Sequence, residues 1–241
     1  MERLQSITVL GGSAASNFKM QSQENSWPKL LEASLPNSID FKIEIRSGLT
    51  FTRAIPILAD LKNEDLLIFH FGTSIGWPSS IVATGIRLGI NFTNEFGFHQ
   101  SAFRSANRTH RFKSWIRAKI RNFIKYLLFF TGQYRARVNR REIEDQIEAV
   151  TKLAKDKAKR IIWIQHQALH HRSIFLERLT YQRYYKEIER SLQKYKSSEF
   201  TVITLPDSFL KQENYLLDCV HLSEQGHREM FEIVWEAFQA S

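Results

Sequence analysis

The feature of the sequence that most constrains the fold is an almost continuously apolar run at residues 65–71, Asp-Leu-Leu-Ile-Phe-His-Phe, which stops at Gly72. A strand with one face in water alternates apolar and polar side chains, whereas a strand that is covered on both faces is apolar almost throughout. The run therefore predicts a central strand of a parallel sheet that carries helices on both of its faces.

Strands and helices are expected to alternate along the rest of the chain. Shorter apolar or alternating runs predict strands at residues 7–10, 41–46, 161–164 and 200–204, of which 41–46 has the pattern of an edge strand. Helical patterns occur around residues 26–31, at 79–88, 112–130, 141–157 and 173–196, and after His221, where Ser223 is the expected cap. An apolar helical segment after Gly48 is expected to be interrupted at Pro56. This alternation predicts a three-layer α/β/α sandwich around a central, mostly parallel five-stranded sheet, and the length of 241 residues favours a single domain over residues 1–241.

Charge and cysteine content narrow the classes of partner and compartment. The chain has 34 Lys and Arg against 25 Asp and Glu, a net charge of +9, which favours anionic partners such as nucleic acid, lipid headgroups or acidic glycans. Cys219 is the only cysteine, so no disulfide can form within the chain. Residues 1–6 are polar and the apolar run after them is too short for a signal peptide, which predicts a cytoplasmic protein that can lie at the inner face of the membrane.

Several polar or small residues follow the predicted strands directly. Ser13, Gly48, Gly72 and the loop at His166 each come just after a strand. Because the carboxyl ends of parallel strands meet at one edge of a sheet, we expect these residues to gather there and to form a site.

A base and a nucleophile can be proposed from the two ends of the chain. Asp218 and His221 are three residues apart before the last predicted helix, so the carboxylate can hold one imidazole nitrogen and leave the other free as a base. Ser13 follows two glycines and is the best candidate nucleophile. Each motif alone is equally compatible with a tight turn, a phosphate loop or a solvated turn.

Taken together and in order, these pieces resemble the sequence blocks of the SGNH hydrolase superfamily, also called GDSL esterases and lipases. The resemblance implies that Ser13 is the nucleophile and forms an acyl-enzyme, that His221 is the base and that Asp218 orients it. It also implies that Gly48 and Gly72 are the glycines of the second and third blocks, and that the N–H groups of Ser13 and Gly48 stabilise the oxyanion. The implied fold is the flavodoxin-like α/β/α sandwich of that superfamily, and no cofactor or metal is required.

The chain departs from the superfamily pattern in two blocks. Gly12 stands where the first block usually has Asp. Residues 72–75 read Gly-Thr-Ser-Ile where the third block is normally Gly-x-Asn-Asp, so the asparagine that donates a third hydrogen bond to the oxyanion is missing. The side chains that could replace this donor are Ser74 itself, His70, Asn91 and Asn94.

Residues 72–78, which end in a proline, and a basic helical insertion at about 105–140 are similar to a divergent branch of the superfamily that is found with bacterial polysaccharide-biosynthesis genes. Members of that branch often carry Asp and Arg where this chain has Ile75 and Ser79. The resemblance implies a serine esterase or acyltransferase that acts on an acyl ester, expected to be acetyl, of a carbohydrate. The alternatives are a general lipase or thioesterase, and a catalytically weakened domain that binds a glycan, a membrane surface or a protein partner in polysaccharide biosynthesis.

The basic insertion and the remaining histidines have alternative interpretations. The amphipathic pattern at 112–130 fits either a helix that covers the core or one that binds an anionic membrane surface, while no aromatic platform motif supports nucleic-acid binding. His166, with His170 and His171 nearby, lacks the carboxylates or cysteines of a metal site, and we expect His166, His70 and Gly72 to contact substrate instead. His227 is expected at the surface or as a capping residue.

Overall fold

The computed structural model describes residues 4–16, 23–72, 123, 126–127, 130–131, 140–165, 175–216 and 221–240. The helix expected at 79–88, and all of the one expected at 112–130 except residues 123, 126, 127 and 130, lie outside this described part. No helix within the described part has both the length and the apolar composition needed to cross a bilayer.

The described strands form one sheet in which every pairing is parallel. In chain order they are β1 (Ser6–Gly11), β2 (Asp40–Ile45), β3 (Glu64–Phe71), β4 (Ala158–Gln165) and β5 (Phe200–Thr204). Their order across the sheet is β2-β1-β3-β4-β5, so the apolar run of the sequence is the central strand and the alternating run at 41–46 is an edge strand, as predicted.

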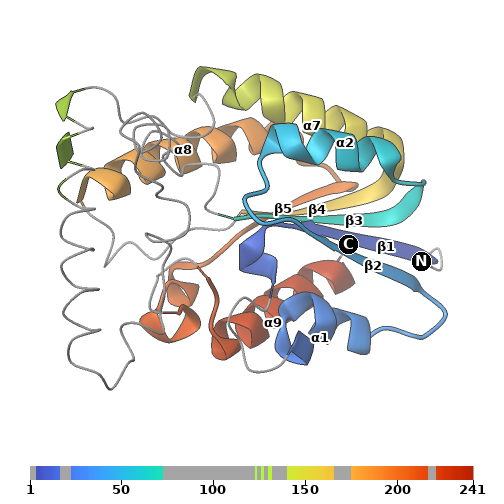
Figure 1. The fold of residues 1–241 in the computed structure, drawn as a ribbon. Coiled ribbons are helices and arrows are strands. Elements are labelled where there is room, and N and C mark those ends of the chain that lie inside the picture. The colour runs from blue at the N-terminus through green and yellow to red at the C-terminus, as the bar shows by residue number, and fades with distance from the viewer. Residues whose placement is uncertain are drawn as a thin grey trace, which may run out of the picture.

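Helices cover both faces of the sheet (Figure 1). One face carries α2 (Phe51–Asp60), α7 (Ile143–Lys157) and α8 (Phe175–Gln193), and the other carries α1 (Trp27–Ala33) and α9 (Glu224–Ala240). Short 3-10 turns complete the described elements: η1 (Ser13–Ala15), η2 (Gln23–Asn25), η4 (Arg140–Glu142), η6 (Asp207–Phe209) and η7 (Gln212–Asn214). The expected three-layer α/β/α sandwich is therefore confirmed.

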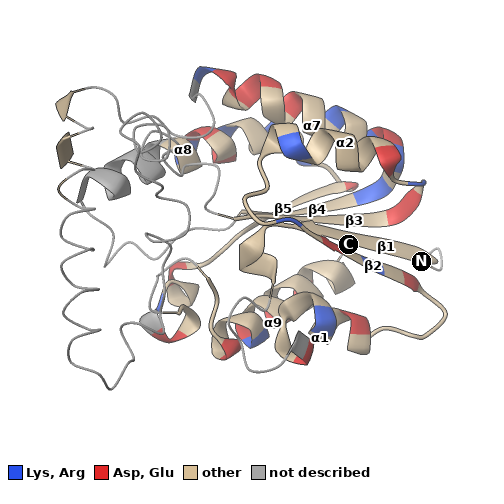
Figure 2. Cartoon of the chain, viewed as in Figure 1, with Lys and Arg blue, Asp and Glu red and all other residues tan. Residues whose placement is uncertain are grey.

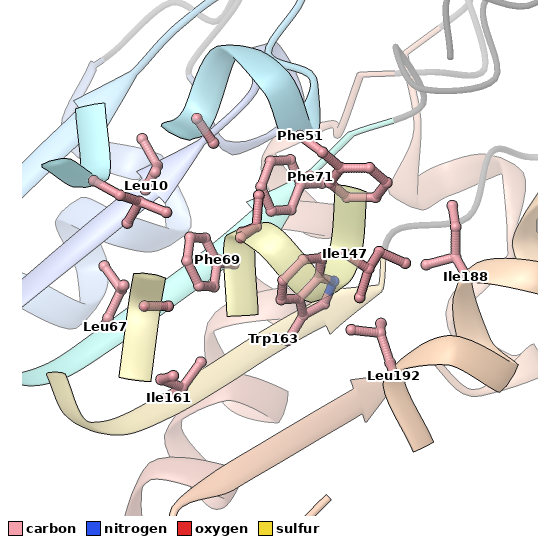
Figure 3. Close-up of a cluster of buried hydrophobic side chains, with 14 of the residues drawn as sticks. Leu10, Phe51, Leu67, Phe69, Phe71, Ile147, Ile161, Trp163, Ile188 and Leu192 are labelled. Carbon is pink, nitrogen blue, oxygen red and sulfur yellow. The ribbon is translucent and has the colours of Figure 1, made fainter. Parts of the chain in front are cut away.

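The central strand supplies side chains to both cores, which explains its apolar sequence. Leu67, Phe69 and Phe71 point to the α2, α7 and α8 side, where Trp163 of β4 lies 4.9 Å from the Phe69 ring and 4.8 Å from the Phe71 ring (Figure 3). Leu66 and Ile68 point to the opposite side, into the core that α1 and α9 close. Successive side chains of a strand face opposite ways, so a strand between two helical layers needs apolar residues at nearly every position.

Charged residues occur along the helices and toward the ends of the strands, while the middle of the sheet carries almost none (Figure 2). The helix after Gly48 differs from the prediction, because α2 continues through Pro56 instead of stopping there. Its buried face, formed by Phe51, Ala54 and Leu58, extends to both sides of the proline. Packing of this face outweighs the local penalty of a proline inside a helix.

Candidate active site

Ser13 lies at the carboxyl end of β1, on the one-turn helix η1. The preceding Gly12 donates its N–H to the His70 carbonyl of β3 at 3.0 Å, and Ser16 donates its Oγ–H to the Ser13 carbonyl at 2.7 Å. No side chain larger than hydrogen fits at Gly11, because a Cβ there would be 2.7 Å from the Ala15 Cβ. Hydrogen bonds on both sides of Ser13 therefore fix the turn that presents its hydroxyl.

His221 is held by the backbone of the segment that leads into α9. Leu216 donates its N–H to the His221 carbonyl at 2.8 Å, and Leu222 forms an antiparallel bridge with Tyr215. Ser223 then caps α9, accepting the Gly226 N–H at 3.1 Å on its Oγ, as the sequence predicted. The position of His221 is thus set before the helix begins.

These two turns, from opposite ends of the chain, meet at the carboxyl edge of the sheet. The Nε2 atom of His221 lies 3.1 Å from the Oγ atom of Ser13, across a sequence separation of 208 residues. A base at hydrogen-bond distance from a hydroxyl is the arrangement that activates a serine nucleophile. The third predicted member, Asp218, lies outside the described residues, so its contact with His221 stays a prediction.

The two backbone donors that the sequence predicts for an oxyanion, the N–H groups of Ser13 and Gly48, both lie among the described residues. Gly48 has a φ of 67°, a conformation that favours glycine, at the turn where Leu49 donates to the Arg46 carbonyl at 3.1 Å. Within the described part of the chain, the N–H groups of Ser13 and Gly48 make no hydrogen bond to the protein. Their role as oxyanion donors stays a prediction, and Ser74 lies outside the described residues.

Of the three residues expected to contact substrate, Gly72 lies beside the nucleophile turn and His70 is buried, while His166 is not among the described residues. Gly72 lies against the nucleophile turn, since a Cβ on it would be 3.3 Å from the Ala14 Cβ. His70 is fully buried, and its Nδ1 accepts the indole N–H of Trp27 at 3.0 Å. The His70 ring lies beneath the protein surface and has no exposed area for a substrate to contact.

Of the two alternatives expected for His227, the surface position is wrong, because the structure buries this side chain completely. Its Nδ1 accepts the backbone N–H of Trp27 at 3.2 Å. Burial lowers the pKa of His227 to about 4, against an opposing effect of the Ser16 backbone and with a further lowering by His221. The sequence did contain a signal: His227, Met230 and Val234 follow helical spacing and form the buried stripe of α9.

Several solved structures share the fold of this chain. No protein-family model matches the sequence, and no curated protein matches it either. Among solved structures, a member of the lipolytic G-D-S-L family from Veillonella parvula is 13% identical, with a TM-score of 0.58 and 98% of each chain covered. A psychrotrophic esterase from Pseudoalteromonas sp. is 11% identical, with a TM-score of 0.56, over 98% of this chain and 97% of that one. An acetyl xylan esterase from Geobacillus stearothermophilus is 12% identical, with a TM-score of 0.57, over 96% of this chain and 93% of that one.

At such identities the likeness concerns the fold, and it extends over nearly the full length of the chain and of these three proteins. The sheet is parallel as predicted, the Ser13 turn follows β1, and the His221 turn precedes α9. The chain therefore has the fold of the SGNH, or GDSL, hydrolase superfamily.

Proposed function

We propose that this protein is a serine-dependent ester hydrolase or acyltransferase. The observation that carries the proposal is the 3.1 Å contact between Ser13 Oγ and His221 Nε2 at the carboxyl edge of a parallel sheet. Two unpaired backbone N–H groups, those of Ser13 and Gly48 within the described residues, add the electrostatic element that acyl transfer needs.

The proposed reaction has two steps. His221 Nε2 takes the Ser13 hydroxyl proton while Oγ attacks the ester carbonyl carbon, and the carbonyl oxygen becomes an oxyanion. The N–H groups of Ser13 and Gly48 receive this charge, and each such donor lowers the barrier by about 3 kcal/mol. The intermediate then expels the alcohol, which takes the proton from His221 and leaves an acyl group on Ser13. Water or a sugar hydroxyl then attacks the acyl-enzyme, with His221 again as base. We assign Asp218 the role of holding the other imidazole nitrogen.

A carbohydrate that carries an acetyl ester is the substrate class that we propose. Two facts support it: the motif resemblance to a branch found with polysaccharide-biosynthesis genes, and the presence of an acetyl xylan esterase among the similar structures. Hydrolysis and transfer differ only in the acceptor, so the natural acceptor decides between esterase and acyltransferase.

The nucleophile can be tested with a Ser13→Ala variant and 4-nitrophenyl acetate. We expect kcat/KM to fall about a thousandfold or more, because serine and histidine of such a site act as a unit. Ser34→Ala is the matched control, since its exposed hydroxyl caps the end of α1 by donating to the Leu30 carbonyl at 2.9 Å. Unchanged turnover in Ser13→Ala would contradict the proposed nucleophile.

The substrate class can be tested with the wild-type chain alone. Acetylated xylo-oligosaccharides, 4-nitrophenyl esters of increasing chain length and acyl thioesters are compared, and intact-mass spectra follow the acyl adduct on Ser13. A preference for short acyl esters of sugars is expected, whereas a preference for long chains or thioesters would favour the lipase or thioesterase alternative. Glycan binding without any turnover or adduct would favour the weakened-domain alternative.

A second proposal concerns the basic insertion, which we infer binds an anionic lipid surface. Phe123, Leu127 and Phe130 share one helical face and are 66%, 52% and 80% exposed. A helix that covers the core would bury this stripe, so the exposure favours the surface interpretation at these residues. The sequence from 96 to 141 holds twelve Lys and Arg and no Asp or Glu, while the rest of the chain has a net charge of −3.

An apolar helical face flanked by cations is the combination that binds an anionic bilayer from one side. Each Lys or Arg near such a surface contributes about 1 kcal/mol of binding free energy, and salt weakens this contribution. A surface attachment of this kind would bring the proposed esterase to substrates at the membrane.

Vesicle co-sedimentation tests the lipid proposal. A triple charge reversal, Arg117→Glu with Arg121→Glu and Lys125→Glu, is expected to abolish binding to vesicles rich in phosphatidylglycerol. Matched reversals on α7 and after α2, Lys152→Glu with Lys155→Glu and Lys62→Glu, change the net charge equally and should bind like the wild type. Equal binding by both triple variants, or equal binding to neutral phosphatidylcholine vesicles, would contradict the proposal.

A further inference from the structure

A chain of buried polar contacts lies beneath the Ser13 and His221 turns. Trp27 donates its backbone N–H to His227 Nδ1 at 3.2 Å and its indole N–H to His70 Nδ1 at 3.0 Å. All three residues are 0% exposed. An imidazole nitrogen that accepts a hydrogen bond carries no proton, so we assign both histidines the neutral form with the proton on Nε2.

His70 and His227, the two histidines of this hydrogen-bond network, are each connected to the proposed active site. The His70 carbonyl accepts the N–H of Gly12, the residue before Ser13, at 3.0 Å. His227 lies in the first turn of α9, six residues after His221, and donates its backbone N–H to the Ser223 carbonyl at 2.9 Å. The nucleophile turn and the turn that carries His221 thus both connect to Trp27.

The His227 imidazole also lies near the far end of the nucleophile turn. Its Nε2 has no hydrogen-bond partner within the described part of the chain, yet the Ser16 backbone is near enough to affect its protonation. Ser16 in turn donates its Oγ–H to the Ser13 carbonyl at 2.7 Å. From the first turn of α9, the His227 side chain therefore reaches α1 and the C-terminal end of η1.

The hydrogen bond from Trp27 to His227 replaces a helix cap. Trp27 is the first residue of α1, and the preceding Ser26 makes no side-chain capping hydrogen bond. The first N–H groups of a helix have no partner within the helix, so a buried one needs an acceptor from elsewhere. His227 supplies that acceptor from α9, and an apolar residue of similar size would leave the Trp27 N–H unpaired in the core.

From these contacts we propose that His227 is a positioning residue that fixes the first turn of α9, and with it His221, relative to α1 and the Ser13 turn. The inference rests on the proposed esterase function of the Ser13 and His221 pair. His227 itself does not touch the reacting atoms, so its effect is expected on the alignment of the pair and not on substrate binding.

Three substitutions separate positioning from packing. His227→Asn places an amide oxygen near the place of Nδ1 and can still accept the Trp27 N–H, whereas His227→Gln has the same chemistry but reaches toward the place of Nε2. His227→Leu keeps the volume and removes every acceptor. We expect kcat for 4-nitrophenyl acetate to fall between about tenfold and a hundredfold in His227→Gln and His227→Leu, since a misplacement of about 1 Å has effects of that size. KM should change little, and His227→Asn should retain most of kcat.

A second measurement reads the geometry without activity. The imidazole ¹⁵N and ¹H resonances of His221 report its hydrogen bond to Ser13, and they should shift in His227→Gln but stay near wild type in His227→Asn. If the wild type turns over no ester, the esterase function fails while these resonances still test the positioning role. Wild-type kcat and unchanged His221 resonances in both amide variants would overturn the inference. An equal loss in both variants that follows only the fraction of folded protein would also overturn it, because that outcome means packing alone.

Discussion

At the scale of single residues, backbone contacts determine the position of the Ser13 and His221 pair. The Ser13 carbonyl accepts a hydrogen bond from Ser16, and the His221 carbonyl accepts one from Leu216. The distance of 3.1 Å between Oγ and Nε2 therefore depends on how closely the two backbone segments can pack. Small residues at the points of closest approach are as important as the reactive side chains.

The backbone at Gly226 packs directly against the backbone of Asn214. A Cβ at this position would lie 2.0 Å from the carbonyl oxygen of Asn214, which is backbone and cannot rotate away. We expect Gly226→Ala to reduce the free energy of unfolding by about 3 kcal/mol or more, beyond the usual range for an overpacked core. Urea unfolding at pH 7 measures the change. Gln225→Ala, one residue earlier on the exposed side of α9, should stay within about 0.5 kcal/mol of the wild type.

Asp65 stabilises the opposite end of β3 in a pH-dependent way. Its pKa is lowered first by the hydrogen bond from Lys159 at 2.9 Å, and then by the backbone N–H of Gln5 at 2.7 Å and of Ser6 at 3.2 Å. A carboxyl whose pKa is lower in the folded state stabilises fully above its unfolded pKa of about 3.9, and this contribution is lost as the pH falls through the folded value.

We therefore expect Asp65→Asn to lower the urea midpoint at pH 7 and to make the midpoint less dependent on pH below about 4. Asp60→Asn is the control, since this exposed carboxylate at the end of α2 makes no ion pair among the described residues. Parallel pH curves for the wild type and Asp65→Asn would contradict the assignment. The proposed active site lies at the carboxyl ends of the strands, whereas Asp65 lies near the start of β3, so turnover at pH 7 should be unchanged.

At the scale of elements, α2 contains a local conflict that packing overcomes. Pro56 is exposed and lies inside the helix, where it removes the N–H that the Thr52 carbonyl would accept. Proline is about 3 kcal/mol less favourable than alanine inside a helix, partly offset because proline also restricts the unfolded chain.

We expect Pro56→Ala to raise the free energy of unfolding by about 1 kcal/mol or more, as the missing hydrogen bond is restored without a change in the buried face. Thermal and urea unfolding measure this gain. Lys62→Ala, just beyond the helix and exposed, should have a negligible effect. A lower stability of Pro56→Ala would mean that the proline makes a contact which the helix requires.

At the scale of the whole molecule, the two cores share one sheet. Trp163 is buried on the side of α2, α7 and α8, and Trp27 is buried on the side of α1 and α9. Strands that belong to both cores, β3 above all, connect the unfolding of one side to that of the other.

We therefore expect a single cooperative unfolding transition for residues 1–241, which is also what the prediction of one domain requires. Trp27→Phe removes one buried indole on the side of α1 and α9, where Trp235 remains, and Trp163→Phe removes the buried indole on the side of α2, α7 and α8. Tryptophan fluorescence of each variant therefore weights the two sides differently, and far-UV circular dichroism reports the helices. Within each variant, the fluorescence and dichroism midpoints should coincide. Separate midpoints would show that one layer unfolds independently.

The sequence alone determined the strands, most of the helices and the order of the chemical groups. An apolar run such as residues 65–71 predicts a doubly covered strand because side-chain alternation is a local property of the backbone. The same holds for Ser223, which caps the helix that begins at the next residue by accepting the N–H of Gly226, three residues later. The carboxyl ends of parallel strands meet at one edge by topology, so the position of Ser13 at the site could also be predicted.

Only the tertiary structure decided how the distant parts meet. It brought Ser13 and His221 to 3.1 Å, continued α2 through Pro56 because its buried face packs on both sides, and buried His227 against the start of α1. It also placed Gly226 against a carbonyl that lies twelve residues earlier in the chain. Contacts of this kind depend on the packing of whole layers. Helical spacing places His227 on the buried face of α9, but no local pattern names the residue that it meets there.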